Sequence, residues 1–112
     1  MIINETKNVT LAEKVITAST IFKRMKGLLG LDKLGAQYAM VIKPCNSIHT
    51  FFMRFPIDVL FLGKDKKVIK AITNMPPFRV SPIYIKSLLV VELPAGVIES
   101  TATSVGDQLS IL

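Results

Sequence analysis

The residue types that could do chemistry in this chain are concentrated in residues 44–63, which read PCNSIHTFFMRFPIDVLFLG. This stretch holds the only cysteine of the 112-residue chain, Cys45, and its only histidine, His49. It also holds Arg54 and Asp58, and the aspartate stands directly before an apolar run. A thiolate beside an imidazole can act as a nucleophile with its base, or the two can be ligands of a metal.

The spacing of Cys45 and His49 argues against both roles. Four residues of extended strand separate two such positions by about 13 Å, so only a turn between them would bring them together. Zinc takes four ligands, or three and a water, and this set would need Asp58, Glu92 or Met53 to complete it. A cysteine hydrolase needs an orienting side chain and an oxyanion hole, and no known signature surrounds Cys45. We therefore expect no metal or other cofactor.

Asp58 is expected to be buried, which requires a partner for its charge. In a strand over 57–62 it shares a face with Leu60 and Leu62. A buried carboxylate is costly unless a cation or several donors meet it. Arg54 and Arg24 are the obvious partners, with Thr50 or backbone amides as alternatives, so the first interpretation is a structural salt bridge or turn cap. The second interpretation is a ligand-contacting pair.

The hydrophobic pattern predicts a mainly β (α+β) chain. Gly63 to Lys67 has the length and turn chemistry of a hairpin loop, and the prolines of 74–82 predict an irregular segment. The segment 49–54 is interpreted as a further strand. Closure of short strands removes exposed edges, so we expect a small barrel-like or folded antiparallel or mixed sheet with one or two short helices. The expected strands are 13–17, 38–42, 57–62, 68–72, 88–93 and 108–112, with short β-prone pieces in 9–18, a helix over about 19–29 and a helical turn over 97–101.

Length and charge bound the class of protein. The chain is long enough for one domain, 1–112, and carries a net charge of +6. Lysines or acids interrupt every apolar run before it reaches the roughly 18 residues of a membrane span. The first residues lack the pattern of a secretory signal, so we expect a cytoplasmic protein. A basic domain can bind nucleic acid or another anionic surface, but no ribonucleoprotein motif accompanies its phenylalanines, so nucleic acid is not the expected partner.

Four motifs in order give the chain a family resemblance. They are Arg24-Met25-Lys26-Gly27-Leu28-Leu29, the core from His49 to Leu62, Val91-Glu92-Leu93-Pro94-Ala95-Gly96, and Gly106-Asp107. Together they resemble the domain-of-unknown-function 192 family of bacterial and archaeal proteins, over roughly residues 8–112. The resemblance implies no activity. It implies that relatives often carry an export signal. This chain departs from them, because we expect no such signal from its first residues.

The residues favour a small non-catalytic binding or accessory domain, expected to be a monomer. Its pocket or groove would take a small or anionic ligand, or a protein partner. The ligand-binding candidates are His49, Arg54, Asp58, Arg24 and Cys45. The alternative is a small enzyme, either a Cys/His-based hydrolase or one with a weakly held metal.

Overall fold

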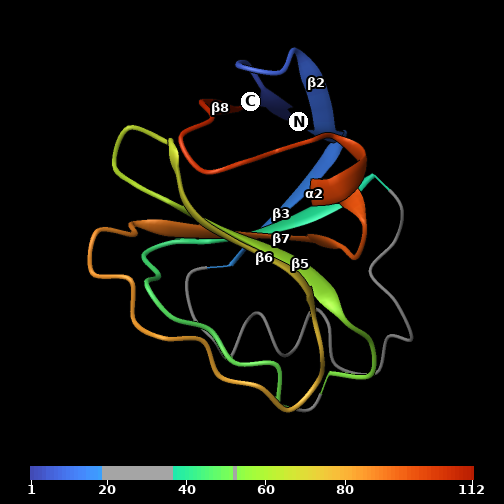
Figure 1. Cartoon of the computed structure of the whole chain (residues 1–112), viewed down its shortest axis with the longest axis vertical. Helices are drawn as coiled ribbons and strands as arrows, with labels where there is room; N and C mark the ends of the chain where they lie inside the picture. Colours follow the sequence, from blue (N-terminus) through green and yellow to red (C-terminus); the bar gives the residue numbers. More distant parts are fainter. Residues whose placement is uncertain (19–36, 52) are drawn as a thin grey trace.

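The computed structural model describes residues 1–18, 37–51 and 53–112, which build two β-sheets that share a core (Figure 1). The smaller sheet joins the two ends of the chain. Its strand order is β2-β1-β8, and both pairings are antiparallel. The amino group of Met1 donates a hydrogen bond to the carbonyl of Leu112 at 2.9 Å. The strands are β1 (Ile2–Asn4), β2 (Val9–Ala12) and β8 (Leu109–Ile111).

The larger sheet has five strands in the order β3-β4-β7-β5-β6. The pair β3–β4 is parallel and the other three pairs are antiparallel, so the sheet is mixed. After β7 the chain forms the short helix α2 (Val97–Ser100) and then returns to the smaller sheet. The strands are β3 (Lys14–Ala18), β4 (Tyr38–Ile42), β5 (Ile57–Leu62), β6 (Val68–Met75) and β7 (Leu89–Pro94).

The larger sheet is buried on both faces, which explains why its central strands β5 and β7 are apolar except for one acid in each. Leu60 and Leu62 pack into a core between the two sheets, together with residues of β1, β2, β8 and α2. Val59 and Phe61 point the other way, into a second core that includes Ile48 and other residues of the 43–55 stretch. Burial of both faces therefore requires an irregular chain layer to cover the second face.

The mainly β prediction is confirmed, and so are the strand pattern and the hairpin over Gly63 to Lys67. The described strands form two separate sheets rather than a closed barrel. The helical turn near Val97 is confirmed, whereas the helix predicted over about 19–29 lies outside the described residues. No helix in the described part of the chain is long and apolar enough to cross a bilayer.

The strand predicted over 49–54 is wrong. Only His49 makes a β-bridge, with Val80, and the described residues after it form turns and bends. The cause is tertiary, because the amide and carbonyl groups of Thr50 are used by residues 78 and 79 rather than by a neighbouring strand. The strict alternation of faces expected for this segment therefore does not apply.

Candidate functional site

Asp58 is completely buried on β5, and backbone donors use both oxygens of its carboxylate. Its Oδ1 accepts a hydrogen bond from the amide of Asn74 at 2.8 Å. Its Oδ2 accepts from the amides of Gly96 at 3.0 Å and Ile98 at 2.9 Å. Backbone amides, one of the kinds of partner considered from the sequence, therefore bind Asp58, and within the described residues no arginine forms an ion pair with it. One side chain thus ties β5 to the end of β6 and to the start of α2.

Helix α2 needs these hydrogen bonds because of the residue at its N-cap. Gly96 stands at the N-cap with φ of 101°, and a glycine has no side chain with which to cap the helix. Asp58 supplies the missing acceptor from the neighbouring strand. A hollow of about 310 Å³ opens beside it, between Asn74 and Glu99. A ligand there would have to compete for oxygens that already accept hydrogen bonds, so the role of Asp58 in ligand binding stays a prediction.

Cys45 lies in the irregular layer that follows the cis peptide bond between Lys43 and Pro44. Its Sγ donates a hydrogen bond to the carbonyl of Ser47 at 3.1 Å, a contact that only the protonated thiol can make. A second hollow, of about 260 Å³, is lined by Cys45, Pro44, Asn46 and Ser87. The thiol is therefore half-buried at a polar hollow, in contact with a carbonyl oxygen.

The other candidates occupy different surroundings. His49 is half-buried, and its ring stacks on that of Phe51 with centroids 5.2 Å apart. Arg54 is exposed after the turn, and Arg24 lies outside the described residues. Glu92 is buried on β7, paired in register with Met40 and Val59. Their roles as ligand-binding groups stay predictions.

Metal ligation has no candidate cluster in the part of the chain that the structure describes. Within residues 1–18, 37–51 and 53–112, no three side chains of the types His, Cys, Asp and Glu gather closely enough to hold an ion. Three acids of the described residues are buried, Asp58, Glu92 and Asp107, and two of them, Asp58 and Asp107, accept hydrogen bonds from separate sets of partners. The chemistry of these two carboxylates is hydrogen bonding within the fold.

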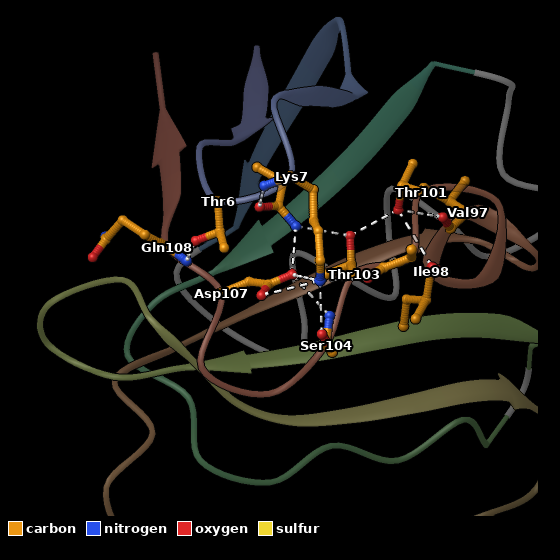
Figure 2. Close-up of polar contacts among 11 residues, drawn as sticks. Thr6, Lys7, Val97, Ile98, Thr101, Thr103, Ser104, Asp107 and Gln108 are labelled. Carbon is orange, nitrogen blue, oxygen red and sulfur yellow. Dashed lines mark hydrogen bonds and ion pairs between the residues drawn. The ribbon is translucent and has the colours of Figure 1, made fainter.

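Asp107 organises a polar network that joins the two ends of the chain (Figure 2). Its Oδ2 accepts from Asn4 Nδ2 at 2.9 Å, from Lys7 Nζ at 3.0 Å and from the amide of Ser104 at 3.0 Å. The same ammonium group donates to the carbonyl of Ala102 and to Ser104 Oγ, each at 2.9 Å. All three N–H donors of the Lys7 ammonium group are thus used. The network holds the loop between α2 and β8 in place.

The network also fixes the charge state of Asp107, which is only 5% exposed. Desolvation acts to raise the pKa of this carboxyl, but the hydrogen bonds from Asn4, Lys7 and the Ser104 amide outweigh it and hold the pKa below the ordinary value of 3.8. Asp107 is therefore ionised under neutral conditions. It stabilises the fold as an anion.

Three lysines line a third hollow, which we call the lysine hollow, at the turn of the β5–β6 hairpin. It measures about 640 Å³ and is lined by Gly63, Lys64, Asp65, Lys67, Ile69 and Lys86. Within the described residues none of these ammonium groups is in an ion pair. The acid of the set, Asp65, accepts a hydrogen bond from the amide of Lys67 at 3.1 Å. Three positive side chains against one negative leave two net positive charges around the hollow.

The sequence alone does not indicate this site, because lysines in a hairpin loop are usually ordinary solvent-exposed residues. Lys64 and Lys67 lie three residues apart in the same loop, and that alone does not predict a binding site. Lys86 joins them through a tertiary contact, since the amide of Leu88 donates to the carbonyl of Leu62 at 2.8 Å and draws the chain before β7 against the hairpin. The run of lysines after Gly63 was the available signal.

Comparison with known proteins gives a family and a fold. The DUF192 family model, described as "Uncharacterized ACR, COG1430", matches residues 2–111. A UPF0127 protein of Pyrococcus horikoshii is 34% identical over 115 residues, covering 97% of this chain and 96% of the relative. A UPF0127 protein of Thermococcus sibiricus is also 34% identical, covering 97% of this chain and 73% of the relative.

Two solved structures share the fold. A protein of unknown function from Novosphingobium aromaticivorans superimposes with a TM-score of 0.75 at 23% identity, covering 87% of this chain and 74% of that chain. A Sinorhizobium meliloti protein gives a TM-score of 0.72 at 22% identity, covering 86% and 79%. The fold described above is therefore also found in two proteins of low sequence identity.

Proposed function

We propose that this chain, which belongs to the DUF192 family as its four motifs predicted, is a non-catalytic binding domain for a small anion. The ligand class is an anion with an apolar body, such as an aryl or alkyl sulfonate, carboxylate or phosphate. The site is the lysine hollow. The observation that carries the proposal is the ring of three lysines around a hollow floored by Ile69.

The charge and shape of the lysine hollow support an amphiphilic anion. Its volume, about 640 Å³, is within the range of small-molecule sites. The lysine stems and Ile69 offer apolar contact, while the ammonium groups offer charge-assisted hydrogen bonds. Mutual repulsion of the lysines raises the free energy of the empty hollow, and a bound anion removes that repulsion. Binding should therefore also raise the melting temperature by mass action.

Gly63 keeps the floor of the hollow open. A Cβ at this position would lie 3.1 Å from Asp65 Oδ1 and 3.3 Å from Ile69 Cδ1, closer than ordinary contact. A Gly63→Ala variant would therefore force the side chains of Asp65 and Ile69, which both line the hollow, to shift by a few tenths of an ångström. Such a variant changes the shape of the site without changing its charge.

A non-catalytic role is supported by the use of the acids. Both oxygens of Asp58 accept backbone hydrogen bonds, and Asp107 is ionised within its own network. Either of these two carboxylates would have to leave its hydrogen bonds to act as a general base or an orienting acid for Cys45 or His49. The enzymatic alternative based on Cys45 or His49 stays a prediction.

The test is a titration with anilinonaphthalene sulfonate, an anion with an apolar body, followed by amide chemical shifts. We expect the largest shifts at residues 63–69 and 86. A double variant, Lys64→Gln with Lys67→Gln, should bind about fivefold to tenfold more weakly, because two attractive charges are lost. The matched control removes two charges elsewhere on the surface, through Lys14→Gln with Lys70→Gln, and should bind as the parent does.

Two further arms make the result decisive. The parent should bind the uncharged analogue phenylnaphthylamine more weakly than it binds the sulfonate. The affinity for phenylnaphthylamine should be the same for the parent and for the double variant. Gly63→Ala should weaken the binding of both probes, because it alters shape and not charge. Equal affinity of the double variant and its control for the sulfonate would overturn the proposal. Shifts confined to residues outside the lysine hollow would overturn it as well.

A further inference from the structure

The loop between β6 and β7, residues 76–88, is held firmly against the segment 43–51. Thr50 is the centre of this attachment and is completely buried. Its Oγ1 donates to the carbonyl of Pro76 at 2.6 Å and accepts from the amide of Arg79 at 2.9 Å. Its backbone amide donates to the Arg79 carbonyl at 2.8 Å, and its carbonyl accepts from the amide of Phe78 at 3.1 Å. The loop is therefore fixed in place by a buried hydroxyl group.

The attachment continues along the loop, which runs beside the 43–51 segment below the larger sheet in Figure 1. Ser81 is 5% exposed, and its Oγ accepts from the amide of Ile48 at 3.0 Å. The amide of Tyr84 donates to the carbonyl of Asn46 at 2.8 Å. Ser87, 8% exposed, donates through its Oγ to the carbonyl of Cys45 at 3.0 Å. The serine side chains of the loop, Ser81 and Ser87, thus point inward.

The apolar side chains of the same loop point outward. Phe78 is 65% exposed, Val80 62%, Ile83 67% and Ile85 87%, and Phe51 of the neighbouring segment is 39% exposed. This inverts the usual distribution, in which serine and threonine are outside and isoleucine is inside. Since the hydrogen bonds above fix the backbone, the apolar side chains are presented outward by a rigid support. A row of exposed apolar side chains of this kind indicates a surface that is covered by something else.

Phe78 adds a local cost to this arrangement. Its φ is 63°, the left-handed region that bulky residues avoid and that glycine or asparagine adopts readily. The backbone of Phe78 is strained while its ring stays mostly in solvent, so this side chain adds little to the stability of the folded chain. A gain from contact outside the chain would account for the residue.

The charge of this face selects the kind of partner. The sequence has no aspartate or glutamate between Asp65 and Glu92, and none in the segment 43–51. Lys43, Arg79 and Lys86 on the two segments are exposed. A second copy of the chain would bring the same cations against them, so like charges oppose self-association through this face. The complement is an anionic surface with an apolar layer beneath it.

We propose that the 76–88 loop docks this domain on an anionic lipid surface. Phe78, Ile83 and Ile85 would enter the boundary between headgroups and acyl chains, while Arg79 and Lys43 would meet lipid phosphates. Apolar insertion and attraction to anionic lipids act together at such surfaces, each weak alone. The rigid backbone reduces the ordering cost on docking. The proposal goes beyond anion binding in the lysine hollow, since it rests on other residues and meets that site only at Lys86.

The test is co-sedimentation with vesicles of phosphatidylcholine mixed with phosphatidylglycerol, compared with phosphatidylcholine alone. We expect binding to the mixed vesicles that falls as salt is raised, and about tenfold or more weaker binding without the anionic lipid. The double variant Ile83→Ser with Ile85→Ser should bind the mixed vesicles at least about tenfold more weakly. The matched control is Val105→Ser, which removes an apolar side chain that is 61% exposed but lies outside the loop, and it should bind as the parent does.

A charge variant separates the two contributions. Arg79→Gln should weaken vesicle binding about fivefold, whereas Lys70→Gln on β6 should change it little. Neither residue lines the lysine hollow, so binding of anilinonaphthalene sulfonate there should be unchanged in both variants. Absence of binding to mixed vesicles, or equal binding by the Ile83/Ile85 variant and its control, would overturn the proposal. Concentration-dependent dimerisation that the Ile83/Ile85 variant abolishes would overturn it in favour of a second copy as the occupant.

Discussion

Two regions of the molecule differ in which side chains they bury and which they expose. One is the region around α2, and the other is the layer formed by residues 43–51 and 76–88. Around α2, two carboxylates are buried and each accepts at least three hydrogen bonds from donors of the fold. In the layer, serine and threonine hydroxyls are buried while four apolar side chains of the loop are exposed. The first arrangement stabilises the chain itself. The second presents a surface to something outside it.

The contrast shows that a residue's chemical type does not assign its role. Asp58 is a reactive type in the segment richest in such types, yet it caps a helix that lacks its own cap. Ile85 carries no reactive group, yet it is the most exposed of the large apolar side chains of the described residues. Burial and partners decide between scaffold and surface. Substitutions in the two regions should therefore have effects of different size and kind.

The largest effect is expected for Asp58→Asn. The amide would replace one acceptor oxygen by a donor, leaving backbone amides of α2 or β6 buried without an acceptor. We expect the free energy of unfolding to fall by about 3 kcal/mol. Urea unfolding monitored by circular dichroism measures it. Glu99→Gln is the control, because it changes an exposed acid on α2, the helix whose first amides Asp58 accepts, and its effect should stay within about 0.5 kcal/mol. Equal stability of the two variants would show that the carboxylate of Asp58 is not structural.

A smaller and pH-dependent effect is expected at Asp107. Its pKa is lower in the folded than in the unfolded state, so its contribution is complete above the unfolded value and is lost as pH falls through the folded value. Asp107→Asn should lower the free energy of unfolding by about 1–3 kcal/mol near neutral pH. The difference between parent and variant should shrink below about pH 4. Denaturant unfolding across this range tests the sign, and a difference that grows on acidification would contradict it.

The smallest change in stability is expected in the 76–88 loop. Phe78→Gly relieves the left-handed strain and removes a ring that is mostly solvated. The free energy of unfolding should rise, or change by less than about 1 kcal/mol, because the lost contacts are few. Thermal unfolding of parent and variant measures this. A loss of several degrees in melting temperature would show that Phe78 is part of the core and would erase the contrast between the two regions.

Much of the fold follows from the sequence because β5 and β7 are mostly apolar runs and the loop between β5 and β6 has clear turn chemistry. Strand boundaries at Tyr38–Ile42 and Ile57–Leu62 agree with the prediction residue for residue. The face shared by Asp58, Leu60 and Leu62 is also correct, since period two is intrinsic to a strand. The three-residue strand β1 was not predicted, because it depends on pairing with β8 at the other end of the chain.

The rest could not be predicted because it depends on contacts between distant residues. Thr50 binds the backbone of residues 76, 78 and 79, which turns a predicted strand into an irregular segment. The outward apolar face of the 76–88 loop follows from that attachment. Lys7 and Asp107 meet from opposite ends of the chain, and no pattern in the sequence links them. Local periodicity predicts elements, and it does not predict which side chains are left exposed when they pack.

The most direct test of the account is amide resonance mapping of the isotope-labelled chain with bicelles of phosphatidylcholine and phosphatidylglycerol. We predict broadening and shifts at residues 76–88 and 43–51, and unchanged resonances at residues 97–107 around α2. Adding anilinonaphthalene sulfonate to the same sample should shift residues 63–69 separately. Perturbation centred on Asp58, α2 and Asp107, with the 76–88 loop unaffected, would contradict the division between scaffold and binding surface.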